Sequence, residues 1–154
     1  MKTEAGGPFR VAAIDHVELF VSSRREAAAW YHRVLGLEIV AGYERWSDDP
    51  GGPLMIAAAD GASKLALFRG EPQRERKTAG FHLVAFRVDA AGFFRFLDRL
   101  PELELDDHRG RRVTRQLVAD HGLAFSIYFS DPWGHRFEIT TYEHEAVRLE
   151  LGRS

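Results

Sequence analysis

Two histidines and one glutamate are the residues of this chain best suited to hold a metal ion. His16 and His82 each lie near the start of a segment with the alternation of a β-strand, and Glu138 lies in a third such segment, residues 136–142. Two imidazoles and one carboxylate leave coordination positions open, as in non-haem Fe(II) oxygenases. Zinc, Mn(II), Ni(II) or Co(II) would accept the same ligands. The alternative is that both histidines are ordinary strand residues and Glu138 is a solvated surface acid.

An internal repeat relates the two histidines. A shift of 66 residues superposes His16 on His82, and the same shift aligns Trp30 with Phe96. Equivalent residues of a repeat lie on equivalent strands, so pseudo-twofold packing of the two copies would bring both histidines into related positions. The repeat therefore favours metal binding over the structural alternative.

Each copy of the repeat has the pattern of a β-α-β-β-β module, in which an alternating strand leads into a capped helix and three strands follow. In the first copy we expect a strand at 14–21, a helix from Ser22 or Ser23 to about residue 35 with Gly36 as its stop, and strands at 37–46, 54–60 and 64–69. In the second copy we expect a strand at 81–88, a helix from Asp89 to about residue 100 ended by Pro101, strands at 112–118, 123–130 and 136–142, and a short polar helix.

The predicted fold class is therefore α+β, with two tandem modules at residues 11–70 and 80–142 inside one domain, 11–142. The charged segment 71–78 connects the modules, and residues 1–10 and 143–154 are tails.

Strand parity places a tyrosine beside Glu138. Polar residues alternate with apolar ones on both sides of the loop 131–135, which contains a proline and a glycine suited to a turn. The odd length of this loop keeps Tyr128 and Glu138 on one face of the hairpin. Tyr128 is therefore expected directly across from Glu138.

Composition limits the chemistry and the partners. The chain has no cysteine, which excludes disulfides, iron–sulfur clusters, thiolate zinc and cysteine nucleophiles. Its 21 basic and 23 acidic residues give a formal net charge of −2, so we expect no nucleic-acid and no membrane partner. Neither a signal-peptide pattern nor a membrane-spanning stretch is present, which favours a cytoplasmic protein.

Residues 11–142 resemble the vicinal-oxygen-chelate superfamily, whose paired β-α-β-β-β modules form a curved mixed sheet around a metal. The resemblance implies that His16, His82 and Glu138 are the metal ligands, and it allows a homodimer. The position of a fourth ligand, a glutamate in glyoxalase I, corresponds to Ala66. This departure argues against glyoxalase I and methylmalonyl-CoA epimerase.

The segment from His121 to Glu138 resembles the signature of extradiol ring-cleavage dioxygenases in the order and spacing of seven residues: His121, Ile127, Tyr128, Asp131, Pro132, Gly134 and Glu138. The resemblance implies an Fe(II) enzyme that cleaves a catechol with O2, the catechol bearing a carboxylate or amino-acid side chain as in L-DOPA dioxygenases. An imidazole titrating near neutrality suits His121 as the catalytic acid/base, and Tyr128 would orient the substrate. Two-domain extradiol enzymes carry a further histidine that has no counterpart between His32 and His82.

Two alternatives stay open. A transferase of the fosfomycin-resistance type would use the same ligands with Mn(II), and a metal-free drug-binding protein of the bleomycin-resistance type would use the same cleft. Four further histidines are expected to be structural or exposed, but His108 lies in the loop 106–112, whose arginines could meet a substrate carboxylate.

Overall fold

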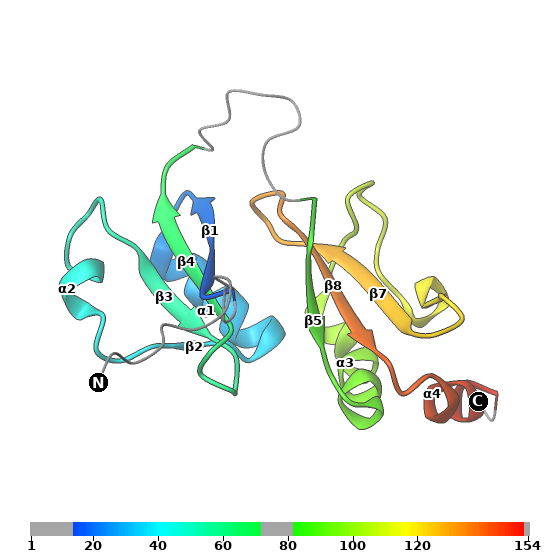
Figure 1. Cartoon of the computed structure of the whole chain (residues 1–154). Coiled ribbons are helices and arrows are strands. Elements are labelled where there is room, and N and C mark those ends of the chain that lie inside the picture. Colours follow the sequence, from blue (N-terminus) through cyan, green and yellow to red (C-terminus); the bar gives the residue numbers. More distant parts are fainter. Residues whose placement is uncertain (1–13, 72–81, 153–154) are drawn as a thin grey trace, which may run out of the picture. The chain divides into compact units, whose positions relative to one another are not determined.

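The computed structural model describes residues 14–71 and 82–152, which fall into two compact units, Met1–Gln73 and Arg74–Ser154. Each unit contains one four-stranded mixed sheet with a helix against it (Figure 1). The predicted α+β class with two tandem β-α-β-β-β modules is confirmed. Residues 72–78 of the expected connection, the strand residue Phe81 and the tail residues 1–10 and 153–154 lie outside the described residues.

Unit 1 has the strand order β1-β4-β3-β2, with β1 parallel to β4. Its elements are β1 His16–Val21, α1 Arg24–Leu35, β2 Glu38–Ile39, α2 Glu44–Ser47, β3 Leu54–Ala57 and β4 Lys64–Arg69. The predicted limits of α1 are confirmed, because the Ser23 hydroxyl accepts a hydrogen bond from the Glu26 N–H and Gly36 ends the helix in the left-handed conformation (φ 68°).

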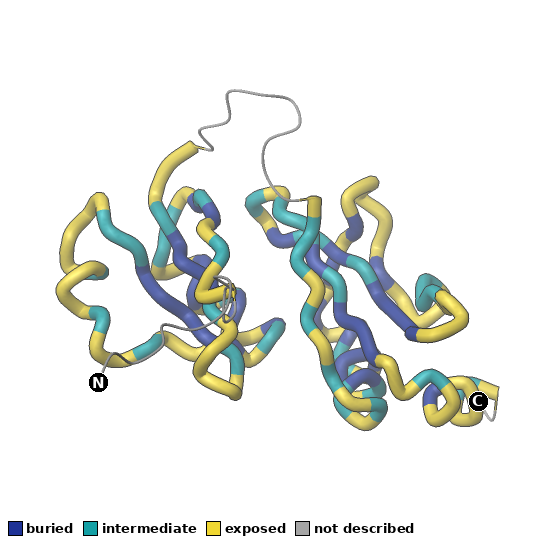
Figure 2. The backbone as a smooth tube through the Cα atoms, viewed as in Figure 1, coloured by how far each residue is buried: buried dark blue, intermediate teal, exposed yellow. Residues whose placement is uncertain are grey.

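Unit 2 repeats this topology with the order β5-β8-β7-β6, and β5 is parallel to β8. Its elements are β5 Val84–Arg87, α3 Ala90–Leu103, a 3-10 helix Arg115–Leu117, β6 Ala119–Asp120, β7 Phe125–Ser130, β8 Arg136–Thr141 and α4 His144–Leu151. Buried residues follow the central strands of both sheets (Figure 2), and none of the described helices is long and apolar enough to cross a membrane.

The expected strand at 37–46 is wrong beyond its first residues. Only β2 pairs there, and α2 replaces the rest. Gly42 turns the chain at φ 94°, and its N–H donates to the Glu44 carboxylate at 3.0 Å. Tyr43 then stacks on Trp46 with ring centroids 4.9 Å apart, and this three-residue spacing favours a helical turn over an extended chain.

Two expectations in the second module are also wrong. Pro101 lies inside α3 instead of ending it. The proline removes one backbone hydrogen bond, but buried Leu100 and Leu103 keep the last turn of the helix packed. The expected strand at 112–118 is instead an isolated bridge at Arg112 followed by the 3-10 helix. An ion pair between Arg115 and Asp98 of α3 accompanies that turn.

Candidate functional site

A row of polar side chains centred on Glu138 lies on one face of the β7–β8 hairpin. Tyr128 lies directly across from Glu138, which confirms the parity prediction. The Ser126 hydroxyl donates to Glu138 Oε1 at 2.6 Å and lies 3.0 Å from the Thr140 hydroxyl. The register depends on the turn, where buried Asp131 accepts the backbone N–H groups of residues 133 and 135. Glu138 is thus half-buried and oriented by a neighbouring hydroxyl.

His121, the residue that follows β6, extends this row of polar side chains. Gly122, at φ 79°, lets the chain reverse between β6 and β7, so His121 faces the same strand positions. Its Nε2 lies 2.9 Å from the Tyr128 hydroxyl oxygen. Burial, followed by the charge of Glu138, raises the pKa of Tyr128 above its usual value. Tyr128 therefore keeps its proton at neutral pH and remains a hydrogen-bond donor.

His16 opens β1 in unit 1 and is oriented by its neighbour in the chain. Its Nδ1 lies 2.7 Å from Asp15 Oδ2, and Lys64 Nζ donates to the other Asp15 oxygen at 2.9 Å. These two hydrogen bonds, that of His16 first, lower the pKa of Asp15. A carboxylate on one ring nitrogen is the arrangement that orients metal-binding histidines and leaves the other nitrogen for the metal. That other nitrogen, Nε2, lies 3.6 Å from Glu18 Oε1.

The repeat implied that His82 and His16 lie at equivalent strand positions, but β5 begins at Val84 and His82 precedes it. Stacked rings link Phe86 to Phe137 (6.0 Å) and Phe137 to Phe129 (5.8 Å), and Phe96 of α3 contacts Phe129 at 5.6 Å. Phe86 therefore lies on the face that α3 covers. His82 lies two residues before β5, outside the paired strand, and its Nε2 approaches Arg136 Nη1 at 3.4 Å.

The opposite face of β5 carries exposed Ala85 and Arg87, and Ala85 lies across from Glu138. In unit 1 the buried residues of β1 are Leu19 and Val21, so His16 lies on the opposite face of that strand. A shift of 66 residues would align buried Leu19 with exposed Ala85. The shift that matches strand faces is 67, which aligns Leu19 with Phe86 and His16 with Leu83.

The constant shift is thus correct for the helices and wrong for the strands. It aligns the helix caps Ser23 and Asp89, and it aligns buried Tyr31 and Val34 with buried Leu97 and Leu100. One additional residue between strand and helix cap in unit 1 accounts for the difference. The assignment of His82 as a metal ligand stays a prediction, and the strand register counts against it because it matches His16 with Leu83.

Cross-strand pairing supports the predicted equivalence of Ala66 and Glu138. Ala66 lies across from Glu18 of β1, just as Glu138 lies across from Ala85 of β5. On this face of each sheet one member of the pair is a carboxylate, Glu18 of β1 in unit 1 and Glu138 of β8 in unit 2. Within the described part of either unit, no three His, Asp or Glu side chains gather into a metal-ligating group.

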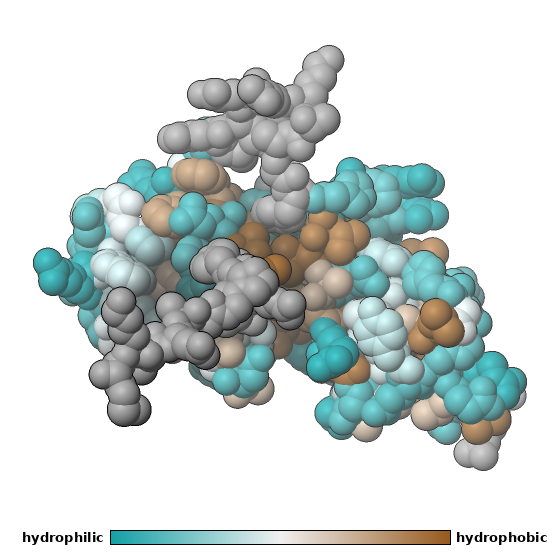
Figure 3. All heavy atoms as spheres, in the orientation of Figure 1, coloured by the Kyte–Doolittle hydropathy of each residue, from teal (hydrophilic) through white to brown (hydrophobic). Residues whose placement is uncertain are grey.

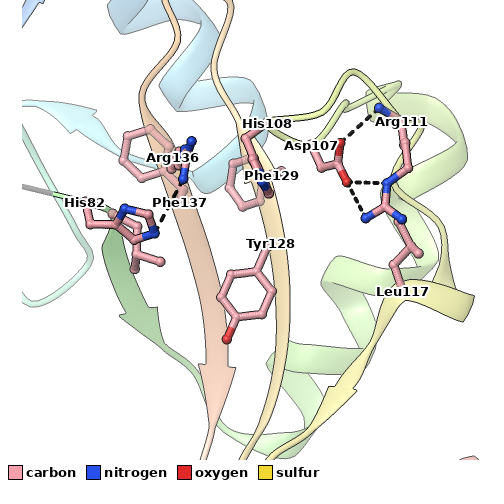
Figure 4. Close-up of a pocket in the computed structure, with 10 residues that line it drawn as sticks. His82, Asp107, His108, Arg111, Leu117, Tyr128, Phe129, Arg136 and Phe137 are labelled. Atoms are coloured by element: carbon pink, nitrogen blue, oxygen red, sulfur yellow. Dashed lines mark hydrogen bonds and ion pairs between the residues drawn. The ribbon is translucent and has the colours of Figure 1, made fainter.

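A pocket of about 230 Å³ lies where β7 ends and β8 begins in unit 2 (Figure 4). Asp107, His108 and Arg111 of the loop 106–112 line it. Arg136 and His82 line it as well, and Arg136 Nη1 lies 3.4 Å from His82 Nε2. The sequence interpretation missed Arg136, although its place two residues before Glu138 puts both side chains on one face of β8.

Comparison with known proteins identifies a family. The profile of the Glyoxalase/Bleomycin resistance protein/Dioxygenase superfamily matches residues 13–139. The fosfomycin resistance protein FosX of Mesorhizobium japonicum is 36% identical over 77 residues, which are 50% of this chain and 49% of the relative. The chain thus matches about half the length of that curated relative.

Solved structures share the fold. A glyoxalase/dioxygenase from Nostoc punctiforme superposes with a TM-score of 0.66 at 20% identity, covering 91% of this chain and 97% of the other. A variant of FosX from Listeria monocytogenes, complexed with Mn(II) and 1S,2S-dihydroxypropylphosphonic acid, superposes with a TM-score of 0.58 at 17% identity, covering 84% and 90%. At these identities the likeness concerns the fold alone.

Proposed function

Because the chain belongs to the glyoxalase/bleomycin resistance protein/dioxygenase superfamily, we propose that it is a metal-dependent enzyme that opens a small epoxide bearing a phosphonate. The observation that carries this proposal is the 36% identity over 77 residues to a fosfomycin resistance protein. The related Listeria protein, complexed with a dihydroxypropylphosphonic acid and Mn(II), supports it. A vicinal diol is the product that water leaves when it opens an epoxide ring. The main expectation from the sequence, an extradiol dioxygenase, thereby becomes the second candidate.

His16 and Glu138 have the donor chemistry that a divalent metal requires. Asp15 holds one ring nitrogen of His16, and Ser126 orients the carboxylate of Glu138, so both proposed ligands have the supporting partners typical of metal sites. The third proposed ligand, His82, fits less well because its Nε2 faces the guanidinium of Arg136. When bound, the metal would polarise the substrate oxygen and increase its leaving ability.

Tyr128 and His121 would handle hydrogen bonding and protons around the ring oxygen. Tyr128 keeps its proton because of its raised pKa, so its hydroxyl can donate to an oxygen held beside Glu138. His121 contacts the same hydroxyl and is exposed, so it can exchange protons with solvent. The pair thus suits a reaction in which an alkoxide-like oxygen must gain a proton.

The test is to incubate Mn(II)-loaded protein with fosfomycin, with and without a thiol, and to follow the phosphonate by phosphorus NMR. We expect the diol to appear without a thiol. Glu138→Gln should lower turnover at least about 100-fold, since a lost ligand costs more than a lost supporting contact. Glu102→Gln removes the same charge from an exposed position of α3 and should leave turnover unchanged. If a product forms only when the thiol is present, the nucleophile is the thiol and not water. If no product forms with or without the thiol, the proposal is refuted.

Extradiol cleavage of a catechol is the second candidate, favoured by one specific observation. The 2.9 Å contact between His121 and Tyr128 and the pairing of Tyr128 with Glu138 bring together three residues of the extradiol signature. Fe(II)-loaded protein given a panel of catechols in air should then consume oxygen and form a coloured ring-cleavage product. His121→Phe should retain iron and lose about two to four orders of magnitude in turnover. Loss of iron from that variant would instead make His121 a metal ligand.

A further inference from the structure

The pocket at the β7–β8 end of unit 2 is rich in cationic and imidazole side chains. It is lined by two arginines, two histidines and one aspartate, together with apolar and aromatic residues: Arg111, Arg136, His82, His108, Asp107, Leu83, Leu117, Tyr128, Phe129 and Phe137. The visible surface around the described residues is mostly hydrophilic, with hydrophobic residues in smaller patches (Figure 3). Which of the two arginines can receive a ligand depends on what each already contacts.

Arg111 is already committed to Asp107. The carboxylate accepts from Arg111 Nε at 2.8 Å and pairs with its Nη2 at 2.7 Å. The second carboxylate oxygen accepts the backbone N–H groups of Arg109 and Arg111 at 2.8 and 2.9 Å. These contacts, led by the Arg111 N–H, lower the pKa of Asp107 to about 2, so the pair is internally neutral at physiological pH.

Arg112, which follows Arg111 in the same loop, is engaged as well. Its Nε donates to Asp106 at 2.8 Å, and Glu104 lies 3.5 Å from its Nη1. Two of the three arginines of the loop 106–112 are therefore held by nearby acids, and the third, Arg109, does not line the pocket.

Arg136 has no such partner. It is half-buried, and no carboxylate of the described residues forms an ion pair with it. Its contact in the pocket is His82 Nε2 at 3.4 Å, drawn as a dashed line in Figure 4. A partly desolvated guanidinium without a counter-anion is an unfavourable arrangement that a bound oxyanion would relieve, because its N–H fork matches the oxygens of phosphonates.

We propose that Arg136, with His82 beside it, binds the phosphonate or phosphate group of a small substrate. The proposal rests on the function proposed above for the same site. Arg136 and Glu138 lie two residues apart on one face of β8, a separation of about 7 Å along a strand. A molecule of a few bonds' length, with an oxyanion at one end and a reacting oxygen at the other, can contact both positions. His82 is then a substrate-binding residue.

The experiment titrates methylphosphonate into metal-free protein and measures its affinity by calorimetry. Arg136→Gln should weaken binding at least about tenfold, the loss expected for a charge-assisted hydrogen bond, and Arg136→Lys should weaken it less. Arg109→Gln is the matched control, because it removes one charge from the adjacent loop without lining the pocket. Its affinity should stay within about twofold of the parent protein. Circular dichroism of each variant shows whether it is folded.

Three results would overturn the proposal: no methylphosphonate binding by the parent protein, unchanged binding by folded Arg136→Gln, or an equal loss in the Arg109→Gln control. Acetate binding as tightly as methylphosphonate would also overturn it, by indicating a carboxylate site. Because the titration uses no metal and no turnover, its failure is distinct from failure of the proposed function. If the protein binds methylphosphonate but not Mn(II), the proposed metal-dependent enzyme function is refuted, whereas anion binding by Arg136 is supported.

Discussion

Individual residues of the site derive their chemistry from one or two immediate contacts. Glu138 is an ordinary strand glutamate by sequence, but the Ser126 hydroxyl at 2.6 Å orients one of its oxygens. Asp15 likewise orients the ring of His16, and backbone N–H groups orient the carboxylate of Asp107. Supporting contacts of this kind hold ligands in place before a metal or substrate arrives.

The first prediction concerns this support for Glu138. Ser126→Ala should lower Mn(II) affinity about tenfold or more, because the carboxylate loses the hydrogen bond that orients it. Calorimetric titration of Mn(II) into the metal-free protein measures the change. Ser130→Ala, on the same face of β7 but across from Arg136, is the control and should bind Mn(II) normally. Equal affinities for all three proteins would mean that the Ser126 hydroxyl does not support metal binding by Glu138.

The second prediction concerns acid stability. The folded-state pKa of Asp107 is about 2, below its ordinary value of 3.8, so folding favours the ionised carboxylate. The stabilisation is fully present above pH 3.8 and is lost as the pH falls through about 2. Asp107→Asn should therefore be less stable than the parent protein at neutral pH, with the difference shrinking in this acidic range. Urea unfolding at a series of pH values measures it, and a difference that does not change with pH would contradict the assignment.

At the scale of elements, the two modules repeat their helices and strands with different offsets. Helix caps and buried helix residues match at 66 residues, whereas the covered strand faces match at 67. Since successive strand residues point to opposite faces, one residue of difference moves a side chain to the other face. His16 therefore lies on the face of β1 opposite buried Leu19 and Val21, and the residue that corresponds to it in unit 2 is Leu83.

The third prediction follows from this phase difference. His16→Ala should lower Mn(II) affinity at least about 100-fold, since a metal ligand is lost. His82→Ala should change it by less than about threefold and should instead weaken methylphosphonate binding. The two titrations use the same metal-free protein. If both variants lose Mn(II) equally, His82 is a ligand after all and the constant shift of 66 residues describes the site correctly.

At the scale of the molecule, the proposed metal ligands come from two separate compact units, His16 from the first and Glu138 from the second. A ligand that binds only the folded protein stabilises every part of it that contributes to the binding site. Metal binding should therefore couple the stability of the two units.

The fourth prediction uses tryptophans as local reporters. Trp30 and Trp46 belong to unit 1, and Trp133 belongs to unit 2. The Trp133→Phe variant keeps only the tryptophans of unit 1, so its fluorescence reports on unit 1. The double variant Trp30→Phe, Trp46→Phe keeps only Trp133 and reports on unit 2. Mn(II) at 100 times its Kd should add about 2.7 kcal/mol, raising the fluorescence-detected unfolding midpoint by about 5–10 °C in both reporters. Adding Glu138→Gln should abolish both shifts. A shift confined to one reporter would place the metal site within that unit.

The sequence by itself determined the two-module α+β fold, the ends of the first helix and the pairing of Tyr128 with Glu138. These features depend on local chemistry: a serine cap, a glycine in the left-handed conformation, and the length of a five-residue turn that sets strand parity. Only the tertiary structure decided the phase of β5 relative to β1 and the pairing of the charged side chains. Strand phase depends on how sheet and helix meet across a connection whose length differs by one residue. The pairing of Arg111 with Asp107, which leaves Arg136 for a ligand, depends on how a loop closes, and spacing along the chain does not encode that.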